Sequence, residues 1–160
     1  MNQPHFTPAE HAHLTAYMLT LARALDLGSW DITLDHHPSS TNTLGQNKTI
    51  HGKRNATIYL HGDWRTDTPA ELRSMLVHEL LHCHFEPAWD IIDIDLANTR
   101  QLAVPAQEIL EKTFGHQMEL LIEQMVYLIA PALPAYEPPG TPPLPDTPLT
   151  GTPPLTGHDA

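Results

Sequence analysis

Cysteine is nearly absent from this chain of 160 residues, which contains only Cys83. A single cysteine excludes an intramolecular disulfide, and it also excludes a structural zinc site built from cysteines alone. Structural disulfides are typical of oxidising compartments, so their absence favours a reducing one. The cysteine count therefore predicts a cytoplasmic protein.

Basic residues and long apolar runs are also scarce. Lysine and arginine number 8 against 19 aspartates and glutamates, which gives a net charge of −11. A broad nucleic-acid interface needs a basic face to neutralise phosphates, so we expect no nucleic-acid partner. Four basic residues that lie close in sequence are interpreted as part of a solvated loop: Lys48, Lys53, Arg54 and Arg65. No apolar run approaches a membrane span and the first residues lack a signal-peptide pattern, so we expect no membrane contact.

Proline is concentrated at one end of the chain. Residues 131–160 contain ten of the sixteen prolines, and proline removes backbone donors and fixes φ. We therefore expect one domain at 1–130 and a disordered, Pro-rich tail at 131–160. The spacing of Pro142 and Pro145 fits a polyproline-binding partner, although we favour a linker or solubilising role for the tail.

Two capping boxes mark the beginnings of helices. Thr7–Glu10 and Thr68–Glu71 both read TPAE, in which threonine is the N-cap, proline begins the helix and glutamate closes the box. The first helix is expected to end at Gly28, as glycine often ends helices. The second helix has an apolar stripe at helical spacing, formed by Leu72, Leu76, Leu80 and Cys83.

The remaining segments complete an α+β pattern. Trp30–Asp35 and Ala56–Asp63 alternate or are rich in β-formers, and they predict two strands. The polar segment 36–55 between them is interpreted as a loop or an irregular hairpin. A third helix is predicted from about Pro105 to just before Pro131. This order of elements favours a small sheet packed on helices.

Residues 78–82 form the motif HELLH. Helix positions four apart lie on one face, so His78 and His82 can bind the same Zn²⁺ through their imidazoles. Glu79 is offset around the helix, where it can take a proton from a metal-activated water without being a ligand itself. The motif therefore predicts one zinc ion per chain, with Glu79 as the general base.

A catalytic zinc site also needs a third protein ligand and an open fourth position. The third histidine of metzincins does not follow His82, so a glutamate from a later helix is the expected solution. His116, Glu119 and Glu123 share one face of the predicted third helix. We expect Glu119 to be the ligand and Glu123 to accept the free N–H of a ligand histidine. Glu123 and His116 remain alternative ligands.

The segments VHELLHCHF and ELLIEQMVYLIAP resemble the minimal gluzincin domains of phage and prophage metallopeptidases, which are similar in style to the SprT-like and ImmA-like families. The motif match covers about residues 75–85 and 116–130, and the order of elements fits over about 7–130. The resemblance implies a zincin-like α+β fold, in which a small sheet packs on the HExxH helix and a second ligand-bearing helix. For a phage-encoded protein it implies the host cytoplasm. One departure is His84, where zincins usually have an apolar residue, and we interpret it as a surface residue rather than a rival ligand.

Motif and resemblance together imply a zinc-dependent hydrolase, in particular a metallopeptidase that acts on a peptide or protein substrate. In zincins the strand before the motif helix pairs with extended substrate, which implies this role for Ala56–His61. His61, at the end of that strand, is a candidate oxyanion stabiliser. The alternative is a catalytically weak, zinc-containing binding or regulatory module of the same fold.

Overall fold

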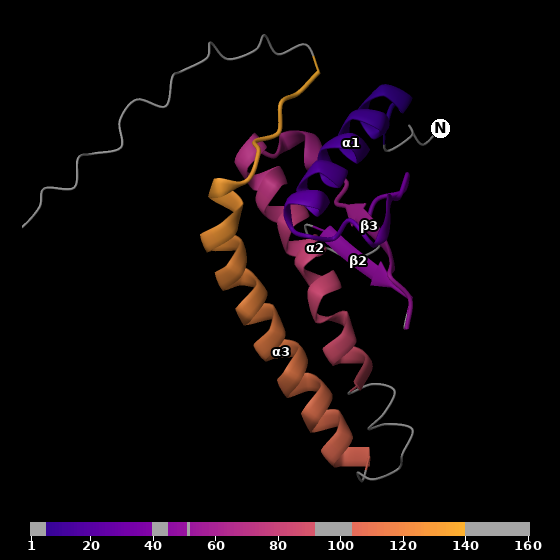
Figure 1. Cartoon of the computed structure of the whole chain (residues 1–160), viewed down its shortest axis with the longest axis vertical. Helices are drawn as coiled ribbons and strands as arrows, with labels where there is room; N and C mark the ends of the chain where they lie inside the picture. Colours follow the sequence, from indigo (N-terminus) through magenta and orange to yellow (C-terminus); the bar gives the residue numbers. More distant parts are fainter. Residues whose placement is uncertain (1–5, 40–44, 51, 92–103, 140–160) are drawn as a thin grey trace, which may run out of the picture.

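The computed structural model describes residues 6–39, 45–50, 52–91 and 104–139. Within these ranges, three α-helices and a three-stranded mixed sheet follow one another in the order α1, β1, β2, β3, α2, α3 (Figure 1). The predicted α+β class is therefore confirmed. In this part of the chain, no helix combines the length and the apolar character needed to cross a membrane.

The sheet consists of β1 (Asp31–Leu34), β2 (Gly45–Thr49) and β3 (Asn55–Leu60) in the order β1-β3-β2. β1 runs parallel to β3, and β2 runs antiparallel to it. Strand side chains alternate between the two faces, and one face is buried: Ile32, Leu34, Ala56, Ile58 and Leu60. The sheet therefore has one core face, which the helices cover.

Two strand predictions need correction. The segment 36–55 was expected to form a loop or irregular hairpin, but it contains strand β2. The segment Ala56–His61 was expected to pair with substrate, but β3 is the central strand and its two edges are occupied by β1 and β2. Strand addition needs a free edge, so β3 has no place for a substrate strand.

Helix α1 (Pro8–Ala24) begins as predicted, with both hydrogen bonds of its capping box in place at Thr7 and Glu10. Its end differs from the prediction, because Gly28 is not the terminating residue. Asp26 takes the left-handed conformation with φ 58°, and the Leu27 N–H donates to the Ala22 carbonyl at 2.8 Å. Aspartate tolerates this region better than most residues, so it replaces the expected glycine.

Helices α2 (Pro69–Asp90) and α3 (Val104–Ile129) lie side by side and run antiparallel, with α2 between α3 and the sheet (Figure 1). The second capping box also forms, between Thr68 and Glu71. The predicted apolar stripe of α2 is buried in the core, which confirms it: Leu72, Leu76, Leu80 and Cys83. From α3, the fully buried Ile122 joins the same core.

The chain continues to pack on the domain after α3, beyond the predicted boundary at residue 130. A short 3₁₀ helix, η3 (Ala130–Ala132), follows α3. Tyr136 is buried, and the Tyr17 hydroxyl of α1 donates to the Pro134 carbonyl at 2.9 Å. The packed region therefore includes at least Tyr136, and residues 140–160 of the predicted tail lie outside the described residues.

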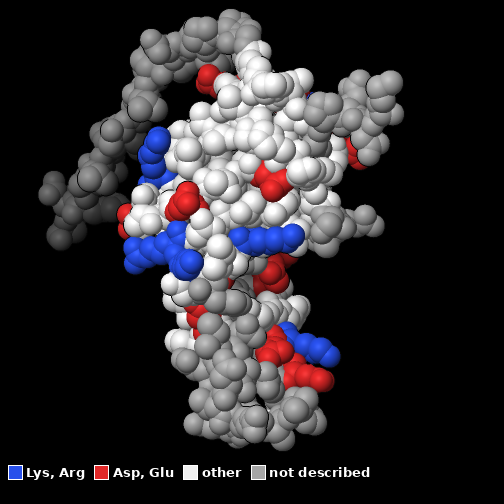
Figure 2. Space-filling view, turned by 90° about the vertical axis from the view of Figure 1, so that its right-hand side faces the viewer, with Lys and Arg blue, Asp and Glu red and all other residues white. Residues whose placement is uncertain are grey.

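The side of the molecule formed by the sheet carries charges of both signs, with lysine and arginine side chains next to aspartates and glutamates (Figure 2). Lys48 lies over the ring of Tyr59, 4.7 Å from its centroid. Arg54 donates to the Ser29 hydroxyl, and Arg65 forms two hydrogen bonds to Glu10. Lys48, Arg54 and Arg65 therefore each make local contacts with neighbouring side chains.

Candidate metal centre

Helices α2 and α3 bring the two motif histidines and one glutamate together. His78 and His82 lie one turn apart on α2, and their rings are 5.1 Å apart. Glu119 of α3 reaches both, with Oε2 3.2 Å from His78 Nε2 and Oε1 3.6 Å from His82 Nε2. Each residue offers one ligand atom such that these three atoms lie within 4.8 Å of one another. It is the one such group of three among the described histidines, cysteines and acidic residues.

The spacing of these donor atoms suits a tetrahedral metal. Donors that are each about 2.0–2.2 Å from a tetrahedral zinc lie roughly 3.3–3.6 Å apart. Each histidine lies at about this distance from one of the two Glu119 oxygens, and one donor atom from each of the three residues comes together within 4.8 Å. Two imidazoles and one carboxylate form a known donor set of catalytic zinc sites, which leaves a fourth position for water or substrate. The three residues therefore form a group that could hold a metal ion, and their chemistry suits zinc.

The protonation state of His82 also fits a ligand. About a quarter of its side chain is exposed, and burial, as the largest cause, lowers its pKa, with the proximity of His78 acting in the same direction and Glu119 opposing. A lowered pKa favours the neutral imidazole, which is the form that binds metals. At neutral pH the neutral, metal-binding form of the His82 imidazole is therefore favoured.

Glu79 points from the same helix into a nearly closed environment. It is 6% exposed. Its pKa is raised to about 8, mainly by burial and further by the nearby charge of Glu119, while a hydrogen bond from the Asn47 backbone acts in the opposite direction. Glu79 therefore holds a proton at neutral pH in the metal-free protein. A cation at the three ligands would favour its ionised form, which a general base requires.

Strand β2 forms the cover over Glu79. An ideal Cβ added at Gly45 would lie 2.6 Å from Glu79 Oε1 and 2.9 Å from Met75 Sδ, distances that real Cβ atoms do not adopt. The Asn47 side-chain amide donates to the Glu79 carbonyl at 2.7 Å and to Cys83 Sγ at 3.4 Å. The absence of a side chain at Gly45 thus allows β2 to lie against Glu79, and the hydrogen bonds of Asn47 hold β2 to the motif helix α2.

A cleft of about 1070 Å³ contains the candidate ligands and is lined by residues of β2, α2 and α3. Among the described lining residues, the acidic and basic ones apart from the two motif histidines are all glutamates: Glu71, Glu79, Glu86, Glu119 and Glu123. No lysine or arginine is among its described lining residues. The cleft is therefore anionic, which favours the binding of a cation.

The other two candidate ligands on α3 lie apart from the histidines. Glu123 lines the cleft one turn beyond Glu119, but in the described part of the chain it has no hydrogen bond or ion pair with His78 or His82. His116 is exposed and is not among the residues that line the cleft. Of the three residues that share this helix face, the structure brings Glu119 to the histidines.

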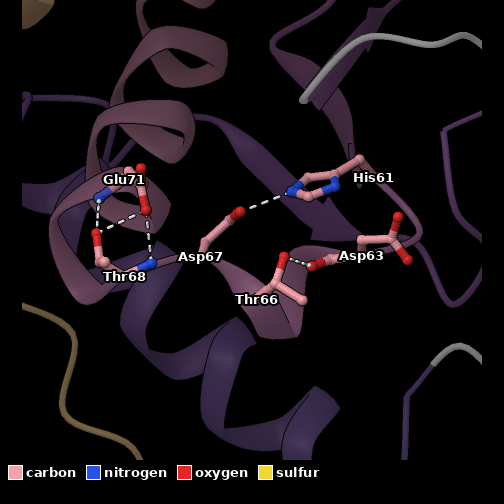
Figure 3. A network of polar contacts seen from close by, with 6 residues as sticks. All are labelled: His61, Asp63, Thr66, Asp67, Thr68 and Glu71. Atoms are coloured by element: carbon pink, nitrogen blue, oxygen red, sulfur yellow. Dashed lines mark hydrogen bonds and ion pairs between the residues drawn. The ribbon is translucent and has the colours of Figure 1, made fainter.

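His61 and His84 have partners elsewhere. His61 Nε2 lies 2.8 Å from Asp67 Oδ2, next to the capping box of α2 (Figure 3), and it does not line the cleft. We therefore propose no role for His61 at an oxyanion. His84 is exposed and lies 2.7 Å from the Leu25 carbonyl through Nε2, at the end of α1.

Sequence reasoning missed three residues of this site. Gly45 and Asn47 belong to a strand that was not predicted, and their relation to Glu79 follows from tertiary packing alone. Glu86, one turn after His82, is buried and lines the cleft. Its position four residues after a ligand histidine was the one available signal, because such residues share a helix face.

No protein-family model, curated protein or solved structure matches this chain.

Proposed function

We propose that this protein is a zinc-dependent hydrolase with a zincin-like fold, and that it cleaves peptide bonds. One observation carries the proposal: His78, His82 and Glu119 converge with metal-ligand spacing beside the buried carboxyl group of Glu79. A structural zinc site closes all four positions with protein ligands. Three protein ligands in an open cleft, next to a candidate base, favour catalysis instead.

The chemistry divides between the metal and the chain. When bound, zinc supplies an activated water and polarises the scissile carbonyl. Glu79 takes up the proton of that water at its carboxylate and later delivers it to the leaving amine. Gly45 and Asn47 keep Glu79 in place and screen it from solvent, which strengthens its electrostatic interactions.

We assign substrate pairing to β2 instead of the central strand β3. β2 pairs with β3 along one edge, and its residues Gly45, Gln46, Asn47 and Thr49 line the cleft. An extended peptide can hydrogen-bond to an edge strand without requiring a particular sequence. The arrangement therefore supports a peptide substrate over a small rigid amide.

Metal-dependent peptide cleavage tests this proposal. Zinc-loaded protein is incubated with a complex peptide mixture, and new termini are identified by mass spectrometry. We expect cleavage that a chelator abolishes and that added zinc restores. Zinc binding with no new termini over a broad mixture would instead support the zinc-containing binding module.

A further inference from the structure

The two ends of the cleft differ in chemistry. Towards the beginning of α2, the cleft lining includes the polar and acidic residues Glu71, Ser74 and Glu123 beside the apolar Met75 and Val126. Beyond His82, towards the end of α2, it is lined by Phe85, Trp89, Gly115 and Met118, with Glu86 as the acidic residue at this end. A substrate that crosses the metal centre along α2 would therefore meet the aromatic side chains on one side.

The apolar end lies within reach of a side chain next to the reacting bond. Phe85 and Trp89 follow His82 by three and seven residues, so they share its helix face, about 5 Å and 10 Å further along the axis. Met118 is adjacent to the candidate ligand Glu119 on α3. A large substrate side chain beside the reacting bond would therefore meet Phe85 first, with Trp89 beyond it.

The walls of this end are held in place by packing. The Trp89 ring stacks on Phe114 with 5.6 Å between centroids and 26° between planes. Phe85 and Met118 are half-buried and pack against the core. Part of this apolar surface stays in contact with water, and covering it with an apolar ligand lowers the free energy of the complex.

Gly115 leaves room in front of the indole ring. An ideal Cβ at this position would lie 3.7 Å from Trp89 Cη2 and 3.8 Å from Cζ3, which is ordinary van der Waals contact. Alanine would therefore fit, whereas a longer side chain would occupy space next to Trp89. The absence of a side chain at Gly115 keeps this part of the cleft open.

The geometry points to a subsite for one apolar, preferably aromatic, substrate side chain, formed by Phe85, Trp89, Gly115 and Met118. This inference rests on the proposed function, because it assumes a substrate held at the metal centre. It also excludes acidic side chains, since all acidic or basic residues of the described cleft lining, apart from the histidines, are glutamates. The subsite thus determines which residue lies beside the cleaved bond.

Amino-acid hydroxamates test the subsite without any turnover, because they share one metal-chelating group and differ in the side chain. Their dissociation constants are measured on zinc-loaded protein by calorimetry, with visible spectra of the cobalt-substituted protein as a second readout. We expect phenylalanine hydroxamate to bind at least about tenfold more tightly than glycine hydroxamate, and aspartate hydroxamate to bind most weakly.

Two variants and two controls complete the experiment. Trp89→Ala and Gly115→Leu should each reduce the phenylalanine preference to less than about threefold and leave glycine hydroxamate within about twofold. Gly62→Leu and Tyr127→Ala should keep the preference, because an added Cβ at Gly62 has no neighbour within 4 Å, Tyr127 is 82% exposed, and neither residue lines the cleft. Trp89→Ala removes the ring that stacks on Phe114 and could prevent folding. Gly115→Leu removes no side chain, so it tests the subsite independently of Trp89→Ala.

The outcomes separate the subsite from the metal centre. Equal binding of all hydroxamates, or a preference that survives both variants, would overturn the subsite while the metal centre stands. If no hydroxamate binds and the protein takes up no zinc, the proposed function fails and the subsite fails with it. A preference seen in a protein without peptidase activity would still support the subsite.

Discussion

In a Glu79→Gln variant we expect hydrolysis to fall by about 10²–10⁴-fold while the protein keeps about one zinc ion per chain. Glutamine has the shape of glutamate but cannot accept the proton of the attacking water. Glu79 is not among the three candidate ligands, so zinc content should not change. The measurement is the rate of peptide cleavage together with metal analysis of the same sample.

The same variant should change how the stability of the metal-free protein depends on pH. Burial, together with the charge of Glu119, raises the pKa of Glu79 from 4.5 to about 8 in the folded state. As the pH rises from about 4.5 to 8, the unfolded chain releases this proton and the folded protein keeps it. The free energy of unfolding therefore decreases over this range, by something on the order of 4 kcal/mol.

Glu79→Gln has no such proton, so its unfolding free energy should be flatter across the range and higher than that of the wild type at pH 8. Urea titrations at several pH values in the presence of a chelator measure this difference. Turnover at the wild-type rate in Glu79→Gln would end the assignment of Glu79 as general base. Parallel pH profiles of the two proteins would show that the carboxyl group is not buried as described.

In a Gly45→Ala variant we expect at least about a tenfold loss of kcat/KM with little change in zinc content. The new Cβ would overlap Glu79 Oε1 and Met75 Sδ, so either the strand or the base must move. A small displacement of a catalytic group can reduce the rate strongly. Overpacking of this kind also costs about 1–3 kcal/mol of stability, which thermal unfolding will show.

Gly62→Ala is the matched control for this substitution, because an added Cβ there has no neighbour within 4 Å. It should leave kcat and thermal stability near those of the wild type. A Gly45→Ala protein that is as active and as stable as Gly62→Ala would show that β2 does not constrain Glu79.

The motif helix could be predicted from the sequence because its signals are local. The capping box at Thr68 and the stripe from Leu72 to Cys83 depend on the period of one helix, and that period also places His78 and His82 on one face. The strand β2 could not be predicted in this way, because its sequence GQNKT has no apolar alternation. It becomes a strand by pairing with β3 and packing on α2.

The choice between Glu119 and Glu123 is likewise decided by tertiary packing. Both residues share a helix face, so periodicity cannot tell which of them lies opposite the histidines. The fully buried Ile122 fixes how α3 sits in the core, and this packing sets Glu119 at the level of His78 and His82. The contact between Gly45 of β2 and Glu79 of α2 likewise depends on tertiary packing, because the two residues belong to segments that are distant in sequence.

The metal centre is the central claim, and zinc affinity measured on the wild type beside Glu119→Ala and Glu123→Ala tests it most directly. The wild type should bind about one zinc ion per chain, and Glu119→Ala should bind it more than about 100-fold more weakly. Glu123→Ala, matched in size and helix face, should stay within about tenfold of the wild type. A wild type without zinc affinity, or a Glu119→Ala protein that binds zinc as the wild type does, would contradict the assignment.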